Sequence, residues 1–178
     1  VKSVTAASGQ APKTPRVSIT GGEPLVFADL VAGVGRALRP EGWQLHLETA
    51  AIDADALARC VDQVDHLSAD WKLPVTIGGV DHGESHLACC RLALARGATV
   101  DVKLVLTKGA AAVAVESALD RLAVLREGIL LVLQPVTPHL RETEPLPSEN
   151  LDAAVAAATL RGFDFRVLPQ VHKALRVP

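Results

Sequence analysis

Hydrophobic positions along the chain follow two different periods. Short runs rich in Val, Ile, Leu and Thr alternate with segments in which apolar residues recur every third or fourth position. These patterns are typical of strands and of amphipathic helices, respectively. Because the two kinds of segment alternate, the pattern predicts βαβ units and an α/β fold with a mostly parallel sheet. Strands are predicted at residues 16–20, 43–49, 66–73, 100–107, 128–133 and 163–168, and helices at 25–38, 53–61, 81–96, 110–125, 149–160 and 170–175.

The number of strands limits the architecture. A closed barrel of eight strands takes about 250 residues, whereas this chain has 178 residues and about six strands. We therefore predict an irregular segment at residues 1–15 and one domain at residues 16–178. That domain is either an open doubly wound sheet or an incomplete (β/α) barrel with outer helices. In both architectures the chemistry lies at the carboxyl ends of the strands.

Composition argues against some classes of function, including nucleic-acid binding and membrane insertion. The net charge is −2 and the chain has no block of Lys and Arg, which argues against docking on a nucleic-acid backbone. No apolar run is long enough to span a bilayer, and no signal-peptide pattern opens the chain. We therefore expect a soluble, cytoplasmic protein without a membrane partner. The first residue is Val1 rather than Met, which indicates a processed chain, an alternative start codon or a fragment.

The cysteines are too few and too scattered for a disulfide framework. The sequence has three of them, Cys60, Cys89 and Cys90. Cys60 and Cys89 fall on predicted helices away from the strand ends, and the side chains of Cys89 and Cys90 diverge by roughly 100° on a helix. We therefore expect packing residues rather than ligands of one metal cluster.

Histidines offer a second candidate chemistry. His82 and His86 are four residues apart at the start of the predicted helix 81–96 and could share a face to bind a metal. The more ordinary interpretation is a solvated first helical turn. His46 and His66 lie on predicted strands, where we expect hydrogen-bonded residues of the interior, and no metal ligand is assigned.

Glycines and a carboxylate follow the first two predicted strands. Gly21 and Gly22 let a ligand approach the backbone closely, and we expect a Cβ at Gly22 to intrude on that ligand. The helix that starts next favours negative charge at its beginning, and Glu23 supplies an acceptor for an ammonium group. Glu48 ends the second strand, where a carboxylate is seldom structural because parallel strands are covered on both faces.

Charged and polar residues also end the later strands. Asp70 and Lys72 are two residues apart at the end of the third strand, so they share a face. They either pair with each other or contact a ligand. Gln134 ends the fifth strand, and residues 170–173 follow the last one. All these groups are predicted to meet at one edge of the sheet.

The string TGGEPL at residues 20–25 resembles the glycine-rich motif of radical S-adenosylmethionine (SAM) enzymes. Further strings resemble those of the 7-carboxy-7-deazaguanine synthase family, in the same order and over essentially the whole chain. The ordered series carries the resemblance more than any single string does. The strings are HLET at 46–49, DWKLP at 70–74, VKLVLT at 102–107, VLQPVTP at 132–138 and PQVHKAL at 169–175.

The resemblance implies an incomplete barrel of the radical SAM type and a carbon–nitrogen lyase. The family converts 6-carboxy-5,6,7,8-tetrahydropterin to 7-carboxy-7-deazaguanine, in 7-deazapurine and queuosine biosynthesis. It uses SAM, a 4Fe–4S cluster and Mg²⁺, and the resemblance further implies a homodimer and a reductant protein such as flavodoxin or ferredoxin. Matched by motif, the residues facing the pterin are Thr20 and Pro178. The residues that bind SAM are Gly21, Gly22, Glu23, Glu48, Asp70, Trp71, Lys72, Leu133, Gln134, Pro135 and Val136.

One part of the family pattern does not occur in this sequence. In the family, a loop with three cysteines holds the cluster and precedes the glycine motif by several tens of residues, and the Mg²⁺ contact lies near it. Here twenty residues precede Gly21, and none of them is Cys. We therefore expect an N-terminally truncated piece that is inactive alone. The alternatives are a cluster-free relative that binds SAM or a pterin-like ligand, and another radical SAM branch such as a glycyl-radical activating enzyme.

Overall fold

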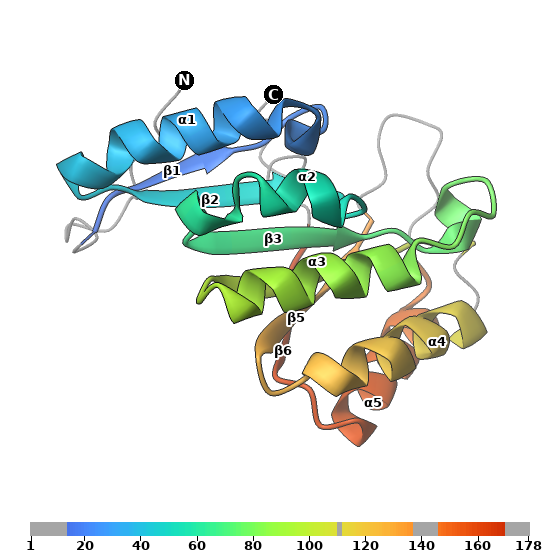
Figure 1. The fold of residues 1–178 in the computed structure, drawn as a ribbon. Coiled ribbons are helices and arrows are strands. Elements are labelled where there is room, and N and C mark those ends of the chain that lie inside the picture. The colour runs from blue at the N-terminus through green and yellow to red at the C-terminus, as the bar shows by residue number, and fades with distance from the viewer. Residues whose placement is uncertain (1–13, 110–111, 137–145, 170–178) are drawn as a thin grey trace.

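The computed structural model describes residues 14–109, 112–136 and 146–169, which form a curved α/β unit (Figure 1). The strands are β1 (Arg16–Ile19), β2 (Gln44–Thr49), β3 (His66–Trp71), β4 (Thr99–Leu106), β5 (Ile129–Pro135) and β6 (Phe165–Val167). The α-helices are α1 (Ala28–Leu38), α2 (Ala54–Ala58), α3 (Gly83–Ala95), α4 (Ala112–Leu122) and α5 (Ser148–Leu160). Short 3-10 helices are η1 (Pro24–Phe27), η2 (Arg39–Glu41), η3 (Val61–Gln63), η4 (Pro74–Thr76) and η5 (Ala123–Leu125).

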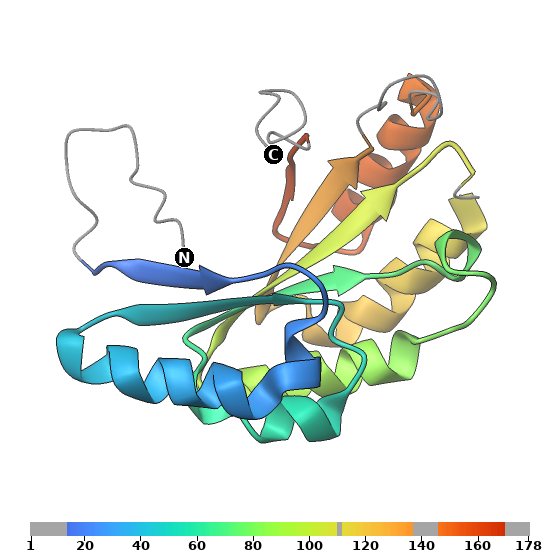
Figure 2. The ribbon, with the colours of Figure 1, turned by 90° about the horizontal axis from the view of Figure 1, so that it is seen from above.

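The six strands form one sheet in the order β1-β2-β3-β4-β5-β6, so each strand pairs with its neighbour in sequence. All five pairs are parallel. Seen from above, the sheet turns steadily from β1 to β6 and stays open (Figure 2). The prediction of an incomplete barrel with parallel strands is confirmed.

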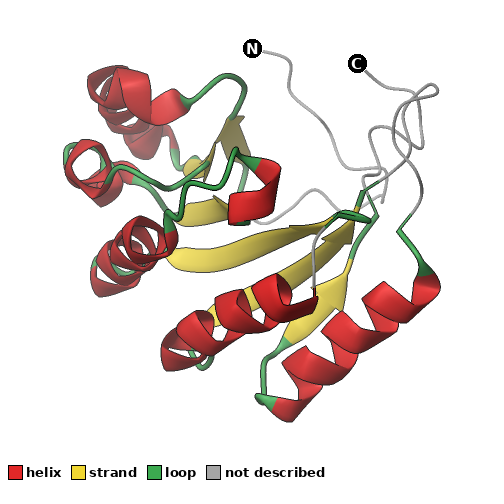
Figure 3. Cartoon of the chain, turned by 90° about the vertical axis from the view of Figure 1, so that its right-hand side faces the viewer, coloured by secondary structure: helices red, strands yellow, loops and turns green. Residues whose placement is uncertain are grey.

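The α-helices lie along one face of the sheet, in an arc outside the strands (Figure 3). The doubly wound alternative, which needs helices on both faces, is therefore wrong. Apolar side chains from alternate strand positions fill the layer between helices and sheet, and this burial is the main stabilising contribution to such a fold. Its fully buried leucines include Leu45, Leu47, Leu67, Leu104, Leu131 and Leu133.

The opposite, inner face of the sheet is polar. In β2 the positions alternate, so that Leu45 and Leu47 are buried under the helices while His46 and Glu48 point to the inner face and are half-buried. The same alternation brings polar positions of β3 and β4 to this face, because paired strands share their facing. Because one face of the sheet is covered and the other is polar, apolar and polar residues alternate in the strand sequences.

The predicted elements match the structure to within a few residues at their ends. The predicted helix 25–38 starts as the 3-10 helix η1 before α1 begins at Ala28, and the predicted helix 53–61 shortens to α2 followed by η3. The predicted helix 170–175 and nearly all of the segment 1–15 lie outside the described residues. None of the helices in the described ranges has the length and apolar character needed to cross a membrane.

The close approach of α1 to η3 gives a first test. A Cβ added at Gly35 would lie 2.5 Å from the Cβ of Gln63, whereas at Gly33 the nearest atom is the tip of the Arg36 side chain at 4.0 Å. Replacing a helical Gly by Ala normally stabilises by about 1 kcal/mol. We expect Gly33→Ala to follow that rule and Gly35→Ala to destabilise by about 1–3 kcal/mol because of overpacking. Urea unfolding of both variants checks this, and a stabilised Gly35→Ala would contradict the packing.

Candidate functional site

The carboxyl ends of β2 to β5 surround a hollow of about 380 Å³. We call this region the strand-end edge. It combines carboxylate, ammonium and amide groups with a few apolar side chains, as small-molecule sites do. The lining residues are Glu48, Asp70, Trp71, Lys72, Thr76, Ile77, Val105, Thr107 and Gln134. Four residues predicted from charge and polarity at strand ends, Glu48, Asp70, Lys72 and Gln134, therefore meet in one place.

Lys103 of β4 forms an ion pair with Glu48 across the inner face. Both side chains are partly buried, with 19% of Lys103 and 34% of Glu48 exposed. Burial acts to raise the pKa of Glu48, but the hydrogen bond and charge of Lys103, with smaller contributions from His46 and Thr20, outweigh it and lower that pKa. Glu48 is thus held as a carboxylate.

A second ion pair lies beside the first. Lys72 Nζ is 3.2 Å from Asp70 Oδ2, and both side chains keep about a third of their surface exposed. The structure therefore confirms that Asp70 and Lys72 pair with each other, which was one of the two alternatives predicted from the sequence. It also places both residues on the hollow, so the pairing does not remove them from the strand-end edge.

The glycine turn after β1 has left-handed backbone at both glycines, with φ of 92° at Gly21 and 57° at Gly22. L-residues with a Cβ rarely adopt this conformation. A Cβ built at either position meets no atom within 4 Å. The turn therefore requires glycine for conformational reasons, and the intrusion of a Gly22 Cβ on a bound ligand stays a prediction.

Glu23 holds this turn to the end of β2. Its Oε1 accepts hydrogen bonds from the Leu25 amide at 3.0 Å and from the Thr49 hydroxyl at 2.5 Å. Its Oε2 accepts one from the Ala50 amide at 2.9 Å. The carboxylate thus accepts hydrogen bonds from three donors of the protein itself, and its contact with a ligand ammonium group stays a prediction. Its role in the described structure is to tie the turn to its neighbouring strand.

Other residues matched by motif lie apart from the hollow or reach it only in part. Trp71 borders the hollow, but its ring is buried on the helix side and stacks on His86 with ring centroids 4.7 Å apart. Leu133 is fully buried in the helix–sheet core. Pro135 and Val136 are half-buried and are not among the lining residues. Pro178 lies outside the described residues.

A line of hydrogen bonds crosses four strands below the strand-end edge. Ser18 Oγ lies 2.9 Å from His46 Nδ1, and His46 Nε2 lies 2.8 Å from Ser68 Oγ, which donates to Asp101 Oδ1 at 2.8 Å. His66 bonds the same carboxylate. The expectation that His46 and His66 are hydrogen-bonded interior residues is confirmed. Burial would raise the pKa of Asp101, but the bonds from His66 and Ser68 outweigh it and lower that pKa.

The three cysteines do not fit an iron–sulfur cluster. Cys60, Cys89 and Cys90 are each at most 1% exposed within the core. Burial raises the pKa of the Cys60 thiol to about 11 and those of Cys89 and Cys90 to about 12, whereas cluster ligands are thiolates. The prediction of packing residues is confirmed. In the described ranges no group of three His, Cys, Asp or Glu side chains could hold a metal ion.

One prediction about histidine needs correction, and one lysine was missed. His86 is fully buried rather than part of a solvated helical turn. Lys103 is the ion-pair partner of Glu48, and the sequence patterns did not identify it as a site residue. In the register between β3 and β4, Lys103 pairs with Asp70, which places it on the inner face beside the residues of the site. A lysine at an inner, strand-end position of a parallel sheet indicates a charged partner.

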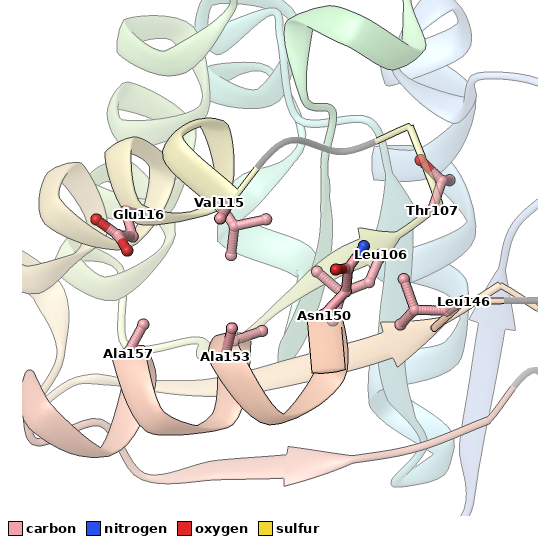
Figure 4. A pocket seen from close by; sticks show the side chains of 10 residues that line it. Leu106, Thr107, Val115, Glu116, Leu146, Asn150, Ala153 and Ala157 are labelled. Carbon is pink, nitrogen blue, oxygen red and sulfur yellow. The ribbon is translucent and has the colours of Figure 1, made fainter. Parts of the chain in front are cut away.

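A second cavity lies between α4 and α5 and is not a comparable site. Figure 4 shows mostly apolar side chains around it, and the polar Glu116, Asn150 and Thr107 also line it. Its volume of about 20 Å³ holds little more than a water molecule. The candidate site is therefore the strand-end edge.

The fold places the chain in a class. It resembles the crystal structure of a domain of pyruvate-formate lyase-activating enzyme from Bacteroides vulgatus, with a TM-score of 0.69 and 16% identity, covering 86% of this chain and 99% of that one. The two proteins thus share the fold, which in this chain is an open, incomplete barrel of six strands with its helices outside. No protein-family model matches the chain.

Sequence comparison is more specific. The chain is 30% identical over 157 residues to a 7-carboxy-7-deazaguanine synthase from Geobacter sulfurreducens, covering 88% of this chain and 61% of that protein. It is 36% identical over 160 residues to one from Methanopyrus kandleri, covering 88% and 58%. The chain therefore resembles the 7-carboxy-7-deazaguanine synthases over most of its own length. It spans about three fifths of the length of these relatives.

Half-buried His46 and buried His86 predict how stability depends on pH. Burial lowers the pKa of His46 to about 4, with the charge of His66 as a second cause, and burial lowers that of His86 to about 4. The unfolded chain, with His pKa near 6.5, then binds more protons than the folded chain between about pH 6.5 and pH 4. We expect the free energy of unfolding to fall as the pH decreases through this window. Urea titrations at several pH values measure it, and His46→Asn should reduce the slope; an unchanged slope would contradict the assignment.

Proposed function

We propose that this chain supplies the SAM-binding part of a radical SAM carbon–nitrogen lyase. In this proposal the whole protein converts 6-carboxy-5,6,7,8-tetrahydropterin to 7-carboxy-7-deazaguanine. Support comes from the similarity to proteins of that name over 88% of the chain. The observation that carries the proposal is the strand-end edge, where the Lys72–Asp70 pair and Glu48, the ion-pair partner of Lys103, line a hollow of ligand size.

The chemistry of SAM matches that of this edge. The methionine part of SAM carries one ammonium and one carboxylate group, and its ribose presents two hydroxyl groups. Two ammonium groups and two carboxylates offer partners of both signs, and charge-assisted hydrogen bonds of this kind are about twice as strong as neutral ones. A zwitterionic ligand can therefore replace the internal pairs by pairs with itself, without leaving a buried charge alone.

Each group receives a role in the proposal. Lys72 and Lys103 bind the carboxylate of the ligand, while Glu48 and Asp70 receive its ammonium group or the ribose hydroxyls. Gly21 and Gly22, next to the edge, bring backbone close to the same amino-acid part. Apolar and amide groups around Val105, Ile77 and Gln134 border the adenine. Thr20 and Pro178 face the pterin, and Mg²⁺, the homodimer and the reductant protein belong to the proposal for the whole protein.

The cluster chemistry is not assigned to residues of this chain. The buried cysteines do not fit a 4Fe–4S cluster, so a cluster in the whole protein would be held by other cysteines. The same observation favours a second candidate function, a cluster-free relative that binds SAM or a pterin-like ligand without radical chemistry. The glycyl-radical activating branch is supported by the fold alone, because the solved neighbour of that class is 16% identical.

Substitutions of the two lysines test SAM binding. We expect Lys72→Met and Lys103→Met each to weaken SAM binding at least tenfold, about 1.4 kcal/mol, because each removes a cation opposite the ligand carboxylate. Arg91→Met is the matched control, since Arg91 is exposed on α3 and the substitution removes the same charge. Calorimetric titration with SAM measures the three affinities. Equal affinities for all variants would contradict the placement of SAM at this edge.

Reconstitution of the chain with iron and sulfide tests the cluster assignment. We expect no stoichiometric 4Fe–4S cluster and no 5′-deoxyadenosine after addition of SAM and dithionite, because the three thiols are buried. Thiol labelling provides the control: the folded chain should react slowly, and the urea-unfolded chain should react at all three cysteines. A cluster on the folded chain together with 5′-deoxyadenosine would overturn the assignment of Cys60, Cys89 and Cys90 as packing residues.

A further inference from the structure

His86 lies directly beneath the strand-end edge, although it belongs to the helix layer. It is in the first turns of α3 and is fully buried. Its ring stacks on Trp71, the last residue of β3, with an angle of 25° between the planes. Burial of a polar ring costs desolvation free energy unless its nitrogens form hydrogen bonds. The partners of its two nitrogens therefore indicate what it does.

One nitrogen holds the point at which β3 leaves the sheet. The registered pairing of β3 with β4 ends at Trp71 and Leu104, and Lys72 follows outside it. The backbone amide of Lys72 donates to His86 Nε2 at 3.2 Å. The strand cannot continue regularly, because Pro74 starts the next 3-10 helix and lacks an amide donor. A side chain from α3 thus takes the place of the missing ladder bond.

The other nitrogen, Nδ1, is buried, and within the described part of the chain it has no hydrogen bond of normal geometry. The backbone groups of Ala51 and Ala50, in the turn that follows β2, act to raise the pKa of His86, so the ring lies near that turn. Ala51 is fully buried and has a φ of 52°, the one non-glycine residue with positive φ in the described ranges. A non-glycine residue in this region is strained and persists when its surroundings fix it.

We propose that His86 is a positioning residue of the strand-end edge, whose neutral imidazole joins the Lys72 amide at the end of β3 to the Ala50–Ala51 turn after β2. Its Nε2 accepts from the Lys72 amide and its Nδ1–H points to the carbonyl groups of the turn. Because Lys72 and Glu48 are on the two strands joined in this way, His86 sets the position from which both side chains reach the hollow. Its effect on SAM rests on the proposed function, whereas its effect on the backbone does not.

The neutral state required by this arrangement agrees with the burial of the ring, which lowers the pKa of His86 to about 4 with a further contribution from the charge of His82. A metal-ligand role does not agree with it, because the described residues contain no group of three potential ligands. Simple packing does not account for it either, because Phe would fill the same space and stack on Trp71 without a buried nitrogen.

Two substitutions separate positioning from packing. His86→Phe keeps the stacking and removes the acceptor, whereas His86→Gln keeps an oxygen acceptor near the position of Nε2. Cys90→Ala is the control, because Cys90 is one turn further along α3, fully buried, and remote from the edge. It should lower overall stability without a specific effect on Lys72.

The first readout needs no ligand. Amide hydrogen exchange by NMR should show that the Lys72 amide exchanges at least tenfold faster in His86→Phe than in the original chain, relative to β3 amides. His86→Gln and Cys90→Ala should retain its protection. Nitrogen chemical shifts of His86 in the unsubstituted chain should show an unprotonated Nε2 and a protonated Nδ1. The reverse tautomer, or unchanged Lys72 protection in His86→Phe, would overturn the proposal even if one variant failed to fold.

The second readout is SAM affinity by calorimetry. We expect His86→Phe to weaken binding about tenfold and His86→Gln to restore it to within about threefold of the original chain. If the original chain binds no SAM while the exchange results hold, the proposed function fails for this chain and the positioning role stands. If SAM binds but His86→Phe does not alter its affinity, the link between His86 and the edge is wrong.

Discussion

The rest of the structure depends on one constraint: in the described part of the chain, the α-helices all lie on one face of the sheet. One face is sealed by leucines under the helices, and the other carries polar side chains of β1 to β4. Polar groups on a partly buried face need partners. The line from Ser18 through His46 and Ser68 to Asp101 supplies them across four strands. The inner face is thus held by directed bonds, whereas the outer face is held by close packing.

The same constraint produces the candidate site. Above the hydrogen-bonded line, the strands end with side chains of opposite charge, and Lys103–Glu48 and Lys72–Asp70 pair there. Hydrogen bonds beneath them hold the backbone at these strand ends: Glu23 joins the glycine turn to the end of β2, and His86 accepts a hydrogen bond from the Lys72 amide after β3. Groups held in advance lose little freedom when a ligand arrives, and this reduces the unfavourable part of binding.

Much of the fold could be predicted from the sequence, because alternation in segments such as QLHLET is directly tied to which face is covered. The convergence of Glu48, Asp70, Lys72 and Gln134 followed from the rule that parallel strands end at one edge. The local contacts of Glu23 and Gly22 could not be predicted from the sequence. Spacing gives the residue type needed at a turn, but not whether its carboxylate is already bonded or whether a Cβ has room.

Lys103 and His86 show a different limit of prediction from the sequence, because their roles depend on how the elements pack. The partner of Lys103 is 55 residues away in sequence, so its role becomes evident only when the register of three strands is known. His86 looked like part of an exposed helix start because its neighbours Asp81, Glu84 and Ser85 are polar. Its burial depends on which side of α3 faces β3, and a helix with apolar residues around most of its surface does not specify that side.

The strand order has a consequence for how the chain forms. Every strand pairs with the one that precedes it in sequence, so no strand has to wait for a distant segment before it can join the sheet. Contacts between elements close in sequence favour rapid assembly, because short loops are closed first. A nascent chain emerges from its N-terminus at about 5–20 residues per second, slowly enough for each βα unit to dock on the one before it. The sheet can therefore grow from β1 to β6 in the direction of synthesis, with the strand-end edge completed one strand at a time.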